Sequence, residues 1–114
     1  MMISGRTPIT AGATNSNILQ GQYIEFLPHD CILQFGLTSD EAAITADNIL
    51  VDVLIGTEIV ARQYVPRASA VQPVFPDDFH LSHAAPAGDR LIIGVQNKAG
   101  ATKNLFWVII MDAR

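Results

Sequence analysis

Hydrophobic residues recur along this chain in short runs that Gly, Pro and Asn positions separate. The strongest runs are residues 31–35, 49–55, 58–65, 90–96 and 104–111. Gly56-Thr57 stands between the second and third runs as in a two-residue hairpin, and residues 97–103 form a longer loop between the last two. Helical periodicity is confined to one candidate turn at Ser39–Ala46. The pattern predicts an all-β antiparallel β-sandwich, and among sandwiches we favour a jelly roll.

Two segments lack this pattern. Residues 66–88 hold four of the six prolines, which predicts a crossing between sheets with short edge strands near 71–75 and 79–82. Residues 7–17 are small and polar, with little to contribute to a core. We therefore expect an extended N-terminal arm over residues 1–20 and a single β-sandwich domain over 21–114. Deletion of residues 1–17 should then leave the domain folded and weaken its binding to other chains.

The last strand is apolar on both faces. One face carries Leu105, Trp107, Ile109 and Met111, and the other carries Phe106, Val108 and Ile110. Residues 49–55 and 90–96 show a weaker form of the same pattern. The second face needs cover. Either a loop or the arm of the same chain lies over it, or a neighbouring subunit does. Charged residues make up only 16% of the chain, against about 25% in ordinary soluble domains, so we favour the neighbouring subunit.

Charge and hydropathy narrow the classes of partner. The 114 residues carry a net charge of −4, and the seven basic residues are scattered, whereas a nucleic-acid surface needs clustered positive charge. The longest apolar run, residues 105–111, is far too short to span a bilayer, and we expect no signal peptide. Cys31 is the one cysteine, so a reducing cytoplasm is the simplest place of synthesis. We expect neither a nucleic-acid nor a membrane partner.

The strongest candidate for metal chemistry is residues 77–83 (DDFHLSH). His80 and His83 are three positions apart, which on a strand places them on opposite faces instead of together. Cys31 lies in an apolar run without a basic neighbour, which favours a core thiol over a nucleophile. We therefore expect no catalytic residue, no metal and no cofactor.

Two further groups have structural interpretations. Asp52 is the only carboxylate flanked by apolar residues on a predicted strand, and we expect it to pair with Arg62 across the hairpin. Trp107, Tyr23 and Tyr64 would together form a sugar-stacking platform, but the apolar run around Trp107 favours a core or interface position.

A small, acidic, cysteine-poor jelly-roll chain with a polar N-terminal arm resembles the decoration (cement) proteins of tailed-phage capsids. The resemblance covers the architecture of the whole chain and its ending, residues 87–97 (AGDRLIIGVQN) and 105–110 (LFWVII). It implies dimers or trimers at the junctions between capsomers, with the arm laid over the major capsid protein. The resemblance implies no catalytic residues in this chain.

We expect a viral structural protein, made in the host cytoplasm, that decorates the capsid exterior and stabilises it by bridging neighbouring subunits. Its partners would be the major capsid protein and further copies of itself. The residues expected at these interfaces are Thr7, Ile9, Asn15, Asn17, Phe106, Val108 and Ile110. A carbohydrate- or receptor-binding β-sandwich and a small cupin-like enzyme stay open as alternatives, which a glycan array and a metal assay would separate.

Overall fold

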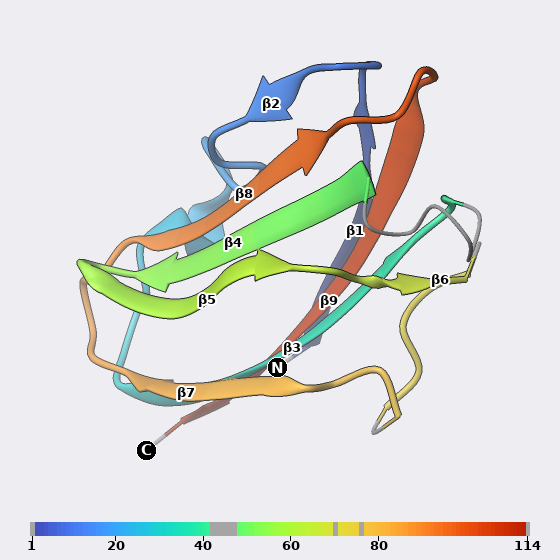
Figure 1. Ribbon diagram of the computed structural model, residues 1–114. Coiled ribbons are helices and arrows are strands. Elements are labelled where there is room, and N and C mark those ends of the chain that lie inside the picture. The colour runs from blue at the N-terminus through green and yellow to red at the C-terminus, as the bar shows by residue number, and fades with distance from the viewer. Residues whose placement is uncertain (1, 42–47, 70, 76, 114) are drawn as a thin grey trace.

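Two β-sheets packed face to face make up the computed structural model, which describes residues 2–41, 48–69, 71–75 and 77–113 (Figure 1). Sheet A contains β1 (Met2–Ile9), β9 (Lys103–Ala113) and β3 (Cys31–Ser39) in that order, with β6 (Arg67–Ala68) and β7 (Leu81–Ala85) paired to β3 beyond them. Sheet B contains β2 (Thr14–Asn15), β8 (Leu91–Asn97), β4 (Ile49–Ile55) and β5 (Glu58–Tyr64). The predicted all-β sandwich is confirmed.

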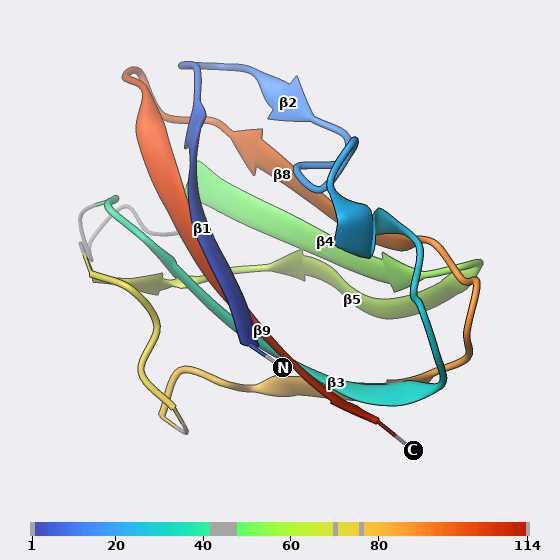
Figure 2. The ribbon, with the colours of Figure 1, turned by 180° about the vertical axis from the view of Figure 1, so that it is seen from behind.

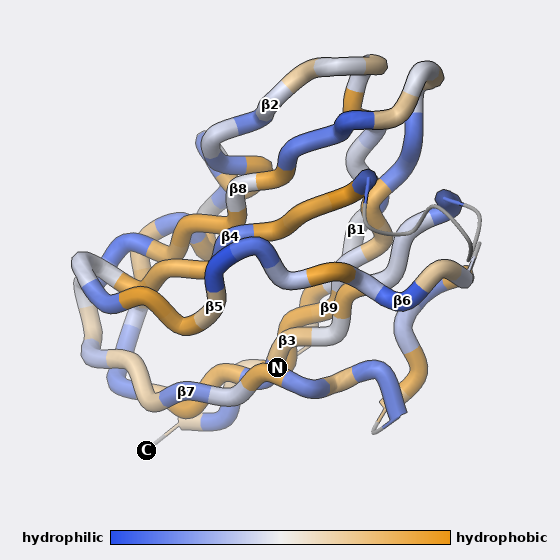
Figure 3. The backbone as a smooth tube through the Cα atoms, viewed as in Figure 1, coloured by the Kyte–Doolittle hydropathy of each residue, from blue (hydrophilic) through white to orange (hydrophobic). Residues whose placement is uncertain are grey.

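The core lies between the sheets, because the long strands turn alternate residues inward. Figure 3 shows long hydrophobic stretches along β4 and β9. In β4 the outward residues Leu50, Asp52 and Leu54 are half-buried. The inward residues of the same strand are Ile49, Val51, Val53 and Ile55. At the end of β4 the chain turns at Gly56, whose φ of 60° favours glycine, and the predicted two-residue hairpin forms there.

Residues 2–9 form the edge strand of sheet A, which differs from the extended arm expected over residues 1–20. β1 pairs with β9 along its whole length, from Met2 opposite Ile110 to Ile9 opposite Lys103 (Figure 2). Ile9 is buried in the core. A Cβ atom at Gly5 would lie 2.5 Å from the Trp107 ring, so the small residue leaves the space that the indole fills.

The segment between β2 and β3 crosses from one sheet to the other. It contains η1 (Tyr23–Glu25), a short 3-10 helix that lies against β8 (Figure 2). Leu19 and Ile24 from this segment are fully buried in the core. Residues 16–27 therefore belong to the body of the domain.

The segment between β5 and β8 departs from the expected edge strands. Residues 71–75 form no strand, and the expected strand near 79–82 begins at Leu81 and runs to Ala85. In residues 71–75 the Val74 N–H donates to the Asp78 carboxylate, where in a strand it would donate to a neighbouring strand. At the candidate turn Ser39–Ala46, Ser39 lies in β3, and positions 42–47 fall outside the described residues. The described residues include no helix long and apolar enough to cross a membrane.

Candidate functional site

His80 and His83, the two histidines weighed above as metal ligands, contact different partners. His80 Nε2 lies 2.8 Å from a backbone carbonyl oxygen and Nδ1 lies 2.9 Å from the Tyr64 hydroxyl. His83 Nε2 lies 3.4 Å from the Glu58 carboxylate and joins β7 to β5. Within the described ranges, no three His, Cys, Asp or Glu side chains are placed to share a metal ion. The two rings are therefore held by different contacts.

Cys31 and Trp107 are core residues. The Cys31 side chain is fully buried, and this burial, together with the nearby Asp30 carboxylate, raises the pKa of the thiol. The thiol therefore stays protonated at neutral pH and packs as a small apolar group. Trp107 is 2% exposed and its Nε1 donates to Thr7 Oγ1 at 3.2 Å. The sugar-stacking platform considered above therefore lacks its tryptophan.

The expected ion pair between Asp52 and Arg62 is wrong, because the pairing of β4 with β5 is irregular. The register shifts between Val51 and Leu54, as in a β-bulge. The backbone N–H of Gln63 consequently donates to Asp52 Oδ1 at 2.7 Å, where an arginine side chain was expected. Gln63 has a φ of 54°, the only positive φ among the described residues other than glycine.

The described residues of 65–80, between β5 and β7, run along the edge of β3, with which both β6 and β7 pair, and we name them the covering loop (Figure 1). The outward residues of β3 beneath it are Gly36 and Thr38. A Cβ at Gly36 would lie 2.6 Å from the Phe79 ring, and Thr38 Oγ1 donates to the Val71 carbonyl at 2.6 Å. The loop and the strand are therefore in close contact.

A buried carboxylate fixes the shape of the covering loop. Asp78 is 2% exposed, and it accepts hydrogen bonds from Arg67 Nη1 and from Val74 N–H, each at 2.9 Å. Burial alone would raise the pKa of Asp78, but the Val74 N–H and the Arg67 guanidinium together lower it below its usual range. Asp78 is therefore ionised at neutral pH and ties both parts of the loop together.

The same loop exposes apolar side chains to solvent. Phe75 is 57% exposed, and its ring meets the Phe79 ring edge-on at 5.2 Å. Val71 is 58% exposed and Val74 is 53% exposed. We name these residues, with Val65, the loop patch. Large apolar side chains held on an anchored loop are typical of a surface that meets another protein.

The outer face of sheet A continues this apolar character away from the loop. Val108 of β9 is buried within the single chain, between Ser4 of β1 and Gly36 of β3. Ile110 is half-buried and pairs with the exposed Met2. Residues 2–9 lie beside β9 and not over it, so of the possible covers the arm does not supply one over this strand. The part of this outer face at Gly36 is covered by Phe79 of the covering loop.

The residues expected at an interface occupy three kinds of position. Ile9 and Asn17 are buried within the domain, as is Val108. Thr7 is half-buried and accepts the Trp107 hydrogen bond. Half-buried side chains at the surface are those of Asn15, Phe106 and Ile110. Thr7 and this last group are therefore the expected interface residues that keep some side-chain surface.

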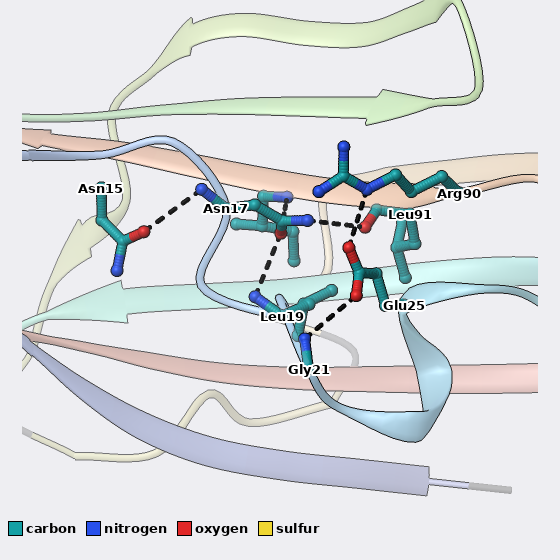
Figure 4. Close-up of polar contacts among 8 residues, drawn as sticks. Asn15, Asn17, Leu19, Gly21, Glu25, Arg90 and Leu91 are labelled. Carbon is teal, nitrogen blue, oxygen red and sulfur yellow. Dashed lines mark hydrogen bonds and ion pairs between the residues drawn. The ribbon is translucent and has the colours of Figure 1, made fainter.

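Asn17 attaches the crossing segment to β8 (Figure 4). Its Oδ1 accepts the N–H groups of Leu19 at 3.0 Å and Ile93 at 3.2 Å, and its Nδ2 donates to the Leu91 carbonyl at 3.4 Å. Because the group is buried, each of these bonds replaces one to water. The role of Asn17 is to hold the fold together.

Glu25 extends this attachment (Figure 4). Its Oε1 accepts Gly21 N–H at 3.0 Å and its Oε2 accepts Arg90 Nε at 2.7 Å. The Gly21 N–H, and then Arg90, lower the pKa of Glu25. The pair stabilises the segment before β3.

A depression of about 310 Å³ lies on the outer face of sheet B. Its lining includes Leu50, Leu54 and Ile92 as apolar walls, with Asp52 as its charged group. The floor is Gly94, which pairs with Asp52 across β8 and β4. This is the second feature, after the loop patch, with the form of a binding surface.

Sequence reasoning missed the loop patch and the depression. The signal for the first was present in residues 77–83, which we weighed only for metal binding, whereas Asp78 in this segment anchors a loop. The signal for the second was Gly94 within a strand, which often marks a close approach or a gap. Comparison with known protein families and with curated proteins gives no match for this chain.

Proposed function

We propose that this protein is a non-catalytic structural protein of a virion, which decorates the capsid exterior and bridges neighbouring capsid subunits. The surface that would meet the capsid is the loop patch with the adjoining outer face of sheet A. The partners are the major capsid protein and further copies of the chain.

The observation that carries this proposal is the exposed apolar tip of an anchored loop. The Asp78 carboxylate and its two hydrogen bonds hold the loop, while Phe75 at the tip is 57% exposed. A rigid apolar projection loses little conformational entropy on binding, which favours a role in contact between proteins.

The strand order supports the jelly-roll part of the proposal. The first strand pairs with the last and the second pairs with β8. Sheet A has the order β1-β9-β3, with the two-residue β6 and the longer β7 both paired to β3, and sheet B has the order β2-β8-β4-β5. In a jelly roll, too, strands from the start of the chain pair with strands from its end. The low charged fraction of 16% favours a chain that covers part of its surface with a partner.

The test is co-sedimentation of the chain with capsids assembled from the major capsid protein of the same genome. We expect the native chain to co-sediment and the Val71→Ser/Phe75→Ser variant to bind at least about tenfold more weakly, because two apolar anchors are lost. Ile59→Ser is the matched control, since Ile59 is 51% exposed but lies on β5 of the other sheet. A native chain that does not co-sediment, or a loop variant that binds as well as the control, would contradict the proposal.

A further inference from the structure

We infer that the depression on the outer face of sheet B binds a primary amine or guanidinium group carried on a short apolar stem. This inference goes beyond the capsid proposal, because the site lies on the opposite sheet from the loop patch. It rests on the gap at Gly94, on the unpaired charge of Asp52 and on the apolar walls beside them.

Because Gly94 has no side chain, the backbone of Ser16 comes close to it, and both residues line the depression. The outward residue opposite Gly94 on β4 is Asp52, and the carbonyl oxygen of Ser16 lies on its other side, 3.1 Å from where a Cβ would be. The pairs on either side keep their side chains, with Leu54 opposite Ile92 and Leu50 opposite Gln96. A depression of about 310 Å³ thus lies open along the sheet face, at the small end of ligand sites.

One negative charge dominates this space. Asp52 is the only charged side chain among the described residues that line it. Asp52 Oδ1 accepts the Gln63 N–H at 2.7 Å, and neither of its oxygens pairs with a cation in the described part of the chain. A half-buried carboxylate without a counter-ion attracts one.

The backbone around Asp52 is strained at the same place. Gln63 has a φ of 54° beside the irregular pairing of β4 and β5, and glycine would adopt this conformation more readily. The strain gives Asp52 a backbone donor on one oxygen, which fixes the direction of the carboxylate. Bulges and strained residues of this kind are concentrated at binding sites.

The lining favours an amine on a methylene stem over a sugar. Leu50, Leu54 and Ile92 offer aliphatic contact of the kind that methylene groups match, and no aromatic ring lines the described cavity. Asn15 and Gln96 also line the space, and amide side chains of this kind can accept N–H groups. A lysine or arginine side chain of another protein and a free alkylamine share this chemistry.

The experiment titrates the full chain with n-pentylamine and follows backbone amide shifts by NMR. We expect saturable shifts at Gly94 and Gln63 with n-pentylamine and at least about tenfold weaker binding of n-pentanol, which has the same stem without charge. Nα-acetyl-lysine amide then distinguishes the sources: binding equal to that of pentylamine indicates a protein side chain, and weaker binding indicates a free amine.

Asp52→Asn tests the charge directly, because an asparagine oxygen still accepts the Gln63 N–H. We expect about a tenfold loss of pentylamine affinity. Asp30→Asn is the matched control, since Asp30 also accepts a backbone N–H, that of Ala87 at 2.8 Å, at a distant exposed site. Gln96→Lys is a second variant at an exposed position, and its ammonium should occupy the site and abolish binding. Equal binding of pentylamine and pentanol, no saturable binding, or an unchanged affinity in both variants would overturn the inference.

Discussion

The outer face of sheet A is crossed by a loop of the same chain, whereas the outer face of sheet B is left open around a depression. Both faces are built from strands that are apolar on two sides, β9 in the first case and β4 in the second. On β9 the buried Val108 lies one strand away from the Phe79 ring over Gly36, while on β4 the outward Leu50 and Leu54 stay half-buried. A two-sided apolar strand therefore indicates that cover is needed, without indicating which chain provides it.

The largest effect is expected from deleting residues 1–17, which removes an edge strand from both sheets at once. The deletion takes away β1, β2 and the buried Ile9 and Asn17. We expect the loss of several kcal/mol, enough to abolish folding of a domain whose total stability is about 5–15 kcal/mol. Far-UV circular dichroism and a thermal melt measure this.

The control for the deletion is Arg6→Ala, which changes an exposed side chain of β1 and should melt close to the native temperature. A truncated chain that still melts cooperatively near the native temperature would restore the extended arm.

Asp78→Ala should uncover sheet A and leave sheet B unchanged. The variant loses the hydrogen bonds to Arg67 and Val74, and we expect a destabilisation of about 2 kcal/mol together with faster amide exchange at Val74. Asp77→Ala removes an exposed neighbouring carboxylate and serves as the control.

The contribution of Asp78 should depend on pH. Because the fold lowers the pKa of this carboxyl, its stabilisation is fully present above about pH 5 and is lost as the pH falls through the lowered value. Melting temperatures of the native chain and Asp78→Ala should therefore converge in acid. A difference that grows as the pH falls would contradict this account.

The smallest effects compare one glycine on each outer face. Gly36→Ala places a Cβ 2.6 Å from the Phe79 ring and should cost about 1 kcal/mol as the ring moves aside. Gly94→Ala places a Cβ 3.1 Å from the Ser16 carbonyl, and the preference for alanine over glycine in a strand, roughly 0.5–1 kcal/mol, offsets most of that crowding. Urea midpoints give both values, and equal losses in the two variants would remove the proposed difference between covered and open faces.

The central strands could be predicted from the sequence because their own residues contribute the core. Runs such as Ile49–Ile55 alternate inward apolar residues whatever their neighbours are. β1 could not be predicted in this way, because the space on its inner face is filled by the partner strand: the Trp107 ring lies where a side chain of Gly5 would be. A strand with small residues opposite a large one looks like an arm when it is read alone.

The two proposed binding surfaces were less predictable than the strands, for a related reason. The anchoring of Asp78 depends on Arg67 and Val74, and the depression depends on the backbone of Ser16 approaching Gly94. Such contacts bring together residues whose separation in the sequence carries no periodic signal. The residue types could be found, but their partners could not.

The pairing of β1 with β9 also sets an order of events during synthesis. Met2 lies opposite Ile110, so β1 leaves the ribosome well before β9 and waits for that strand before this edge of the sheet is complete. Until then the backbone N–H and C=O groups of β1 that pair with β9 lack these partners, and the Ile9 side chain lacks its place in the core. Contacts this distant along a chain slow folding and lengthen the time during which a nascent chain is open to aggregation.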